Sequence, residues 1–345
     1  MQKLRLALAL ARVLMPDGIK RALYSGRLPQ VDGRRIDASA QAVCDLVQLV
    51  RAPGAMPSLQ ESRAQIEMMA AKFDRPTPAT VRKEDISLPG AAGPQPARVY
   101  TPAGVTDDAP ALLYLHGGGW VQGSIDSHDG LCGKLADWAG IRVISYDYRL
   151  APEHKFPAGA DDVLACYRAL VSGETPVRID ASRLAVGGDS AGANLTAALM
   201  HDLGAGGLPL PAAQLLIYPA VDARLESQSM QSLKDQPLLP VVRIHWYLDQ
   251  YLPETQDRLD PRVSPLFSPY LKGQPPAMIV AAGHDPLWDD GQTYATALRD
   301  AGVPVEMAEF EGQVHAFASL TKVIPQGNDA LRRSAAWLRK RLGAA

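Results

Sequence analysis

The residues with the clearest chemical potential surround Ser190. Residues 184–199 read LAVGGDSAGANLTAAL, a short apolar run followed by glycines and then a helical pattern. Within them, GDSAG at 188–192 fits G-x-S-x-G, in which small residues flank a serine on a strained turn between strand and helix. This geometry would expose the Ser190 hydroxyl as a nucleophile and place the Ala191 amide at a helix N-terminus, which favours negative charge. A glycine-rich turn with serine as an ordinary helix cap is the plainer interpretation of the same five residues.

A serine hydroxyl needs a base within hydrogen-bond reach, and that base must be oriented by an acid. Among the histidines after Ser190, His201 falls inside the following helix and would point away from the turn. His315 comes immediately after the last predicted strand, where a loop can return over the sheet. We therefore predict His315 as the base.

The acid is expected at the end of the preceding strand. Asp285 follows that strand directly, whereas Asp289 and Asp290 precede a helical run and are interpreted as first-turn charges that face the helix dipole. We assign the acid to Asp285. Asp162 and Glu311 remain further candidates.

Three consecutive glycines form a second chemical motif, HGGGW at 116–120. After a strand they expose backbone N–H groups without side-chain cover, as a tetrahedral oxyanion requires. We predict an oxyanion hole from Gly117, Gly118 and Gly119 together with Ala191. His116 is then expected to orient the loop rather than to transfer protons.

The same loop also imitates a dinucleotide-binding fingerprint, with Gly117, Gly119 and Gly123 after a strand and Asp147 ending the next one. The spacing of the third glycine is wrong, and residues 120–122 (WVQ) open a phosphate-binding helix poorly. No P-loop and no metal-ligand spacing occurs elsewhere in the sequence. We expect no cofactor and no metal.

Composition indicates an ordinary globular chain. The 345 residues are 47% hydrophobic and 21% charged, with a formal net charge of −2, which gives no basis for nucleic-acid binding or attraction to an anionic membrane. The three cysteines form no C-x-x-C pair, which favours a reducing cytoplasm. Residues 1–15 resemble a signal peptide, but Arg12 interrupts the apolar run, and Leu4, Leu8, Ala11 and Met15 recur at helical spacing. An amphipathic helix is therefore preferred, and export is the alternative. No apolar segment is long enough to cross a bilayer, so stable membrane insertion is not expected.

The elements that must position these residues alternate between strands and helices. Predicted strands cover 85–88, 97–100, 111–115, 142–146, 184–186, 214–218, 278–282 and 305–310. Predicted helices cover 129–139, 160–171, 191–203, 291–300 and 329–342. This alternation predicts a mostly parallel sheet covered on both faces, with the first two strands as an antiparallel edge and the ligand site beyond the carboxyl ends of the strands.

Two segments fall outside the alternation. Residues 1 to about 75 show no convincing strand and are expected to form short helices at 41–50 and 58–73, the second opened by a capping box of Ser58 and Glu61. About sixty residues between Tyr218 and Met278 form an insertion with a helix at 241–251. An insertion of this length is often a lid.

Together these motifs resemble the hormone-sensitive lipase family of α/β-hydrolases, in its bacterial esterase branch with a GDSAG motif. The matching residues are HGGGW at 116–120, YDYRLAPE at 146–153, FPA at 156–158, GDSAGANL at 188–195, DPL at 285–287 and His315. The resemblance implies an α/β-hydrolase fold with a mostly parallel eight-stranded sheet and a helical cap, and a triad of Ser190, Asp285 and His315. The expected division is a cap segment at 1–78, a catalytic domain at 79–223 and 271–345, and a second cap segment at 224–270.

The activity implied is hydrolysis of small carboxylic esters with short to medium acyl chains. The predicted substrate pocket comprises Trp120, Asp189, Trp246, Tyr251 and Trp288. The same scaffold hosts amide and aryl-formamide hydrolases, and also receptors that bind small molecules without turnover but lack the catalytic histidine. Formation of a homodimer is left open.

The chain departs from the family pattern at three positions. Ala316 stands where the family usually has glycine, Asp290 where it often has glutamate, and Trp288 where arginine is common.

Overall fold

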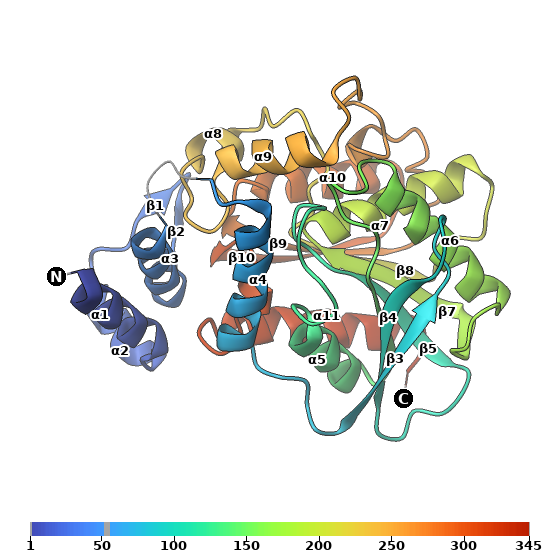
Figure 1. Ribbon diagram of the computed structural model, residues 1–345, viewed down its shortest axis with the longest axis horizontal. Coiled ribbons are helices and arrows are strands. Elements are labelled where there is room, and N and C mark those ends of the chain that lie inside the picture. Colours follow the sequence, from blue (N-terminus) through green and yellow to red (C-terminus); the bar gives the residue numbers. More distant parts are fainter. Residues whose placement is uncertain (1, 52–55, 345) are drawn as a thin grey trace.

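The computed structural model describes residues 2–51 and 56–344, and its centre is an eight-stranded sheet (Figure 1). The strands are β3 (Val81–Leu88), β4 (Gln95–Pro102), β5 (Ala109–Leu115), β6 (Arg142–Tyr146), β7 (Ile179–Asp189), β8 (Ala213–Ile217), β9 (Ala277–His284) and β10 (Val305–Val314). Their order is β10-β9-β8-β7-β5-β6-β4-β3, and only β4 runs antiparallel to its neighbours, β3 and β6. All eight predicted strands and the antiparallel edge are confirmed.

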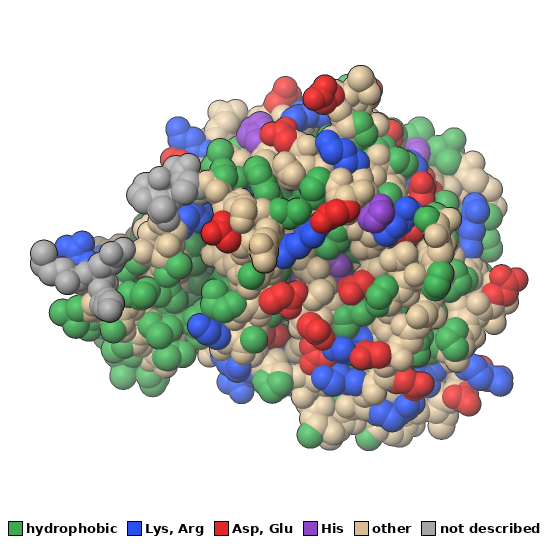
Figure 2. Space-filling model, in the orientation of Figure 1, with side chains coloured by type: hydrophobic (Ala, Val, Ile, Leu, Met, Phe, Trp, Pro, Cys, Tyr) green, Lys and Arg blue, Asp and Glu red, His purple; other side chains and the backbone are tan. Residues whose placement is uncertain are grey.

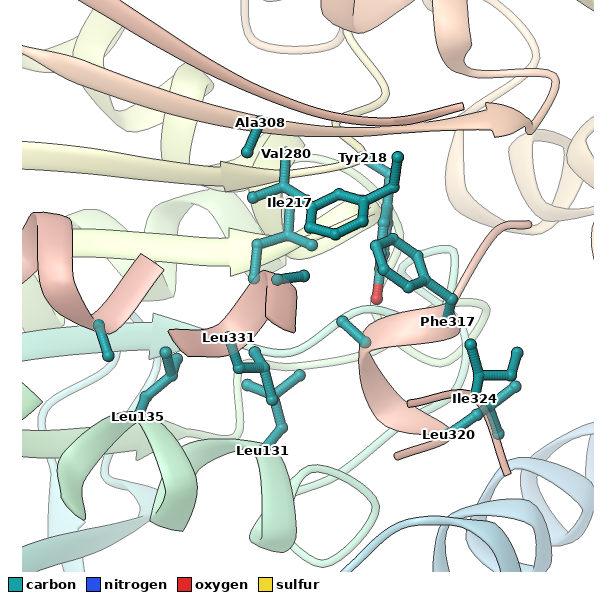
Figure 3. Packing of buried hydrophobic residues seen from close by; sticks show 14 of the residues in the cluster. Leu131, Leu135, Ile217, Tyr218, Val280, Ala308, Phe317, Leu320, Ile324 and Leu331 are labelled. Atoms are coloured by element: carbon teal, nitrogen blue, oxygen red, sulfur yellow. The ribbon is translucent and has the colours of Figure 1, made fainter. Parts of the chain in front are cut away.

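The central strands are buried on both faces. Every residue of β5 is buried, and so is every residue of β8 and β9, because helices cover the sheet from both sides. Figure 3 shows one of these layers, in which Leu131 and Leu135 of α5 and Leu331 of α11 point toward Ile217 and Val280 of the sheet. The layers hold the sheet rigid, so the ends of its strands are well-placed supports for a site.

Eleven α-helices occur among the described residues. They are α1 (Gln2–Leu14), α2 (Asp17–Leu23), α3 (Ala38–Val50), α4 (Leu59–Phe73), α5 (Asp129–Ala139), α6 (Ala158–Ser172), α7 (Ala191–Ala205), α8 (Gln228–Ser232), α9 (Val241–Tyr251), α10 (Trp288–Asp300) and α11 (Gln326–Leu342). Each helix predicted from periodicity is present, and the capping box of α4 is formed by Ser58 and Glu61. Two short 3₁₀ helices, Pro265–Phe267 and Phe317–Ser319, were not predicted.

The prediction that residues 1–75 contain no strand is wrong. Strands β1 (Gln30–Val31) and β2 (Arg34–Arg35) form a small antiparallel hairpin. Its turn residues Asp32 and Gly33 have φ of 48° and 80°, as a tight hairpin requires. The Asp-Gly pair was the available signal, but strands of two residues carry no periodicity that could reveal them.

The amphipathic helix expected at the start of the chain is present as α1. The face that it buries, however, is not the one that carries Leu4 and Leu8, whose spacing predicted the helix. Ala9 and Val13 belong to the core, whereas Leu4 and Leu8 are 66% and 51% exposed. Figure 2 shows hydrophobic side chains gathered over this end of the molecule. None of the helices that the structure describes has the length and apolar character needed to cross a membrane.

Candidate active site

The turn between β7 and α7 holds Ser190 in a conformation that most residues avoid, with φ of 54° and ψ of −116°. The glycines on either side make this turn sterically feasible. A Cβ at Gly188 or at Gly192 would collide with the carbonyl oxygen of Leu115 on the neighbouring strand β5. The strained elbow expected from G-x-S-x-G is therefore formed, and it lifts Ser190 above the carboxyl end of the sheet.

Ser190, His315 and Asp285 lie in one continuous line of contacts. Nε2 of His315 is 3.0 Å from Oγ of Ser190, and Nδ1 of the same ring is 2.6 Å from Oδ2 of Asp285. His315 follows β10 and Asp285 follows β9, so neighbouring parallel strands deliver base and acid to the same edge. The carboxylate is fully buried and also accepts a hydrogen bond of 2.9 Å from the amide of Leu287, which fixes its orientation.

The competing residues lie elsewhere. Asp162 is buried in a bidentate ion pair with Arg149, and Glu311 is exposed. His201 contacts the hydroxyl of Ser268 at 2.9 Å, away from the elbow.

The glycine loop presents two amides to the space beside Ser190. Gly118 and Gly119 have φ of 127° and 62°, and within the described part of the chain neither amide donates a backbone or side-chain hydrogen bond. Ala191 is the first residue of α7, so its amide has no partner within the helix. The prediction is corrected for Gly117, whose N–H donates to Oδ1 of Asp189 at 2.9 Å and is therefore occupied.

Asp189 supports this loop from a buried pair with His128 that sequence reasoning missed. His128 Nε2 lies 3.2 Å from its carboxylate, and the Tyr114 hydroxyl donates to the same carboxylate at 2.8 Å. Burial disfavours the charged carboxylate, but His128 and the hydrogen bonds outweigh burial and lower the pKa of Asp189. Burial likewise opposes the imidazolium, yet the attraction of Asp189 raises the pKa of His128.

His116 occupies the position expected of a residue that orients the glycine loop. Its ring is buried, stacks on Tyr148 with centroids 4.5 Å apart, and hydrogen-bonds through Nδ1 to the carbonyl of Gly117 at 2.9 Å. Burial, together with repulsion from His128, lowers the pKa of His116 to about 4. The ring is therefore neutral at pH 7, and no hydrogen bond joins it to Ser190.

Asp289 and Asp290 are first-turn residues of α10, as predicted, but they also have partners that the sequence did not reveal. Their carboxylates bind backbone amides of distant segments. Asp289 accepts from Ser229, and the fully buried Asp290 accepts from Val221 at 2.8 Å and Asp222 at 3.1 Å. Because burial dominates at Asp290, its pKa is raised to about 8.

Ala316, the residue after the base, has φ of 62°. This left-handed conformation costs a residue with a Cβ about 1 kcal/mol, a cost that glycine avoids. The departure from the family pattern therefore places a methyl group, at a small cost in strain, on the wall of the site.

A cavity of about 160 Å³ lies above the elbow and beneath helices from the N-terminal segment and from the insertion after β8. Its floor includes the glycine loop, the triad serine and histidine, Trp120 and Asp189. Its roof comes from the end of α3, from α4 with Ile66 and Met69, and from α9 with Ile244 and Tyr247.

Three of the predicted pocket residues do not line this cavity. Tyr251 lies behind it, stacked on Trp120 with centroids 4.6 Å apart. Trp246 is half-buried against the ring of Tyr247, and Trp288 packs against the guanidinium of Arg34. The prediction missed Tyr247 because neighbouring helix positions point in directions about 100° apart, and sequence alone did not fix which aromatic residue faces inward.

No group of three or more histidine, cysteine, aspartate or glutamate side chains that could hold a metal occurs in residues 2–51 and 56–344.

Comparison with known proteins gives consistent matches. Residues 112–319 match a family model described as the α/β hydrolase fold. The chain is 41% identical over 281 residues to an ethyl acetate hydrolase of Pseudomonas putida, covering 79% of this chain and 86% of that protein. It is 38% identical over 314 residues to the carboxylic ester hydrolase LipN of Mycobacterium tuberculosis, covering 89% of this chain and 83% of that protein.

Among solved structures, an ester hydrolase from the metagenome of Lake Arreo superposes with a TM-score of 0.84 at 36% identity. The match covers 89% of this chain and 99% of that one, and that structure was solved in complex with a derivative of bipyridine phosphonate.

Proposed function

This chain belongs to the α/β-hydrolase family and is a carboxylesterase of its branch similar to hormone-sensitive lipase, and from this premise we propose that Ser190, His315 and Asp285 are its catalytic triad. The observation that carries the proposal is the line of contacts from Asp285 through His315 to Ser190, with separations of 2.6 and 3.0 Å. Both lie within the range over which a proton can pass between hydrogen-bonded groups.

In the first half-reaction, Nε2 of His315 takes the proton from Ser190 as the hydroxyl oxygen attacks the ester carbonyl. The imidazolium then gives this proton to the departing alcohol, and the acyl group remains on Ser190. In the second half-reaction water attacks the acyl-enzyme with His315 again as base, releasing the acid and restoring the hydroxyl. Asp285 holds the ring in the required tautomer and stabilises its positive form.

The oxyanion of each tetrahedral intermediate is assigned to the amides of Gly118, Gly119 and Ala191. These N–H groups are already oriented, so they need no reorganisation as the charge develops. Asp189 takes no part in proton transfer in this proposal. Its charge holds the glycine loop through the amide of Gly117.

The substrates proposed are esters with short to medium acyl chains. A dry cavity of roughly 150 Å³ is large enough to bind benzene, and the cavity above Ser190 has about 160 Å³. An acyl chain of about six carbons would fill such a volume. Residues 1–78 and 224–270 are proposed as the two cap segments that enclose it over a catalytic domain of residues 79–223 and 271–345.

Replacing the nucleophile tests the proposal. Ser190→Ala is expected to lower kcat on p-nitrophenyl butanoate by at least about 10³-fold, because removal of a triad nucleophile eliminates the acyl-enzyme route. Ser182→Ala, an exposed serine on the same strand β7, is the matched control and should retain wild-type kinetics. Near-normal turnover by Ser190→Ala, with a folded protein by circular dichroism, would exclude the assignment.

A further inference from the structure

The cavity above Ser190 contains two guanidinium groups that the proposed mechanism does not use. Arg243 lies in the first turn of α9, and Arg51 follows the end of α3. Both line the cavity, in a wall that is otherwise mainly apolar. Arg243 is only 5% exposed. Burial of a cation this deep is unfavourable unless an anion or several hydrogen bonds compensate for the lost water.

The described part of the chain supplies little such compensation. No carboxylate of residues 2–51 or 56–344 forms an ion pair with either arginine. Arg243 donates one hydrogen bond from Nη2 to Ser62 Oγ at 2.5 Å, and its Nε is buried without a partner. Arg51 donates to the carbonyl of Pro237 at 2.8 Å. By contrast, the buried Lys134 has a carboxylate partner, Asp74, at 2.5 Å.

The surroundings add further positive potential. Arg243 is the third residue of α9, where the positive end of the helix dipole disfavours a cation. Burial lowers the pKa of Arg51, and repulsion from Arg243 lowers it further. The rings of Trp246 and Tyr247, with centroids 4.8 and 5.1 Å from the Arg243 guanidinium carbon, offset part of this potential. They cannot supply the hydrogen-bond acceptor that Nε lacks.

The guanidinium of Arg243 is close to the proposed reaction centre. The ring of Tyr247 packs directly on the glycine loop, since a Cβ at Gly119 would collide with it. One aromatic ring therefore separates Arg243 from the proposed oxyanion hole. Gln122 also joins Ser62, which is the hydrogen-bond acceptor of Arg243, to Tyr247. It accepts from Ser62 and donates to the Tyr247 hydroxyl at 3.0 Å.

We propose that Arg243 and Arg51 bind a carboxylate on the substrate, so that the preferred substrates are esters carrying a free carboxylate a few carbons from the ester group. Half-esters of short dicarboxylic acids, such as succinic, glutaric and adipic acid, have this chemistry. A guanidinium presents its N–H donors in a planar fork that matches the two oxygens of a carboxylate in geometry and charge. The inference rests on the proposed function, because it names the substrate class of the same cavity.

The test compares two substrates of nearly equal shape, monoethyl glutarate and its uncharged amide, ethyl glutaramate. Wild-type enzyme is expected to have a kcat/KM at least about tenfold higher for the half-ester, mainly through a lower KM. Arg51→Met and Arg243→Met should bring the ratio of the two kcat/KM values close to one. Arg51→Lys should keep a preference for the half-ester, because the charge remains. Arg82→Met, at an exposed arginine of β3, is the control and should leave both values unchanged.

Arg51→Met is the decisive variant if Arg243→Met fails to fold, because Arg51 is only half-buried. Equal wild-type kcat/KM values for the two substrates, or an undiminished preference in Arg51→Met, would overturn the inference and would leave the arginines as purely structural cations. Hydrolysis of ethyl glutaramate by wild type but not by Ser190→Ala would show that the proposed function survives such a result. Turnover of both substrates by Ser190→Ala would instead refute the proposed function itself.

Discussion

At the scale of single residues, two buried carboxylates near the site differ in charge because their partners differ. Asp189 faces the imidazole of His128 and a tyrosine hydroxyl, which together lower its pKa despite complete burial. Asp290 accepts hydrogen bonds from two backbone amides, and burial raises its pKa to about 8. Amide dipoles alone therefore do not replace the lost water around a carboxylate, whereas the imidazole of His128 together with hydrogen bonds does.

Asp290 should make the stability of the whole chain depend on pH. Its folded pKa of about 8 lies above the ordinary value of 3.8, so the folded state holds the proton more tightly. This contribution to stability is complete below pH 3.8 and is lost as the pH rises through about 8. Between pH 6 and pH 9 the wild-type Tm should fall by about 3–6 °C more than that of Asp290→Asn, which keeps an acceptor oxygen but cannot ionise.

Differential scanning calorimetry at the two pH values measures this difference. Asp300→Asn, at the exposed end of the same helix, is the matched control and should follow the wild type. Parallel Tm curves for wild type and Asp290→Asn would contradict a buried carboxyl that gains its charge in this range.

At the scale of elements, the site depends on how closely a strand and a helix approach each other at the elbow. Strand β7 ends at Asp189 and α7 begins at Ala191, so one residue reverses the chain direction. The carbonyl of Leu115 on β5 occupies the space that side chains at 188 and 192 would need. The position of the nucleophile is therefore fixed by the packing of the backbone and not by its own side chain.

Two glycine-to-alanine changes separate this packing effect from helix propensity. Gly192→Ala should reduce both Tm and kcat strongly, because the new methyl group collides with the backbone of β5. Gly291→Ala lies inside α10, where the nearest atom to the new Cβ would be 3.6 Å away. It should raise stability by about 0.5–1 kcal/mol, since alanine favours a helix over glycine. Urea unfolding and ester hydrolysis measure both effects, and a Gly192→Ala enzyme of wild-type stability would refute this account of the elbow.

The sequence was sufficient for the strands of the main sheet, for the longer helices that pack on it and for the order of the chemical groups. Apolar strands between turn residues identified all eight strands of the main sheet, and their ends placed Asp285 and His315 correctly next to each other. The sequence was insufficient where the role of a residue depended on contacts between distant segments. The amide of Gly117 is taken by Asp189, a partner 72 residues away, and no local pattern records that bond.

At the scale of the whole molecule, segments from distant parts of the sequence enclose a single cavity. Helices α3 and α4 come from the first 73 residues and α9 from the insertion after β8, yet all contribute to the roof over Ser190. Figure 1 shows one end of α4 close to α9, where Arg243 of α9 donates a hydrogen bond to Ser62 of α4. Direct hydrogen bonds from Arg63 of α4 to the carbonyls of Val121 and Ala151 hold α4 on the loops that follow β5 and β6.

Because the roof covers the cavity above Ser190, we predict a limit on the length of the acyl chain that the enzyme accepts. Because the cavity has about 160 Å³, kcat/KM for p-nitrophenyl butanoate and hexanoate should exceed that for the dodecanoate by at least about tenfold. Initial rates below the aggregation concentration of each ester measure the profile, with Ser190→Ala as the blank. A profile that rises steadily to the dodecanoate would mean that the roof does not close the cavity.

The most direct test of the central claim is to locate the covalent bond that the nucleophile forms. Wild-type enzyme treated with a p-nitrophenyl alkylphosphonate should release one equivalent of p-nitrophenol and carry the phosphonyl group on Ser190, identified by peptide mass spectrometry. His315→Ala should react at least about 10²-fold more slowly, because the hydroxyl then lacks its base. A phosphonyl group on another residue, or complete inactivation without any adduct on Ser190, would contradict the account.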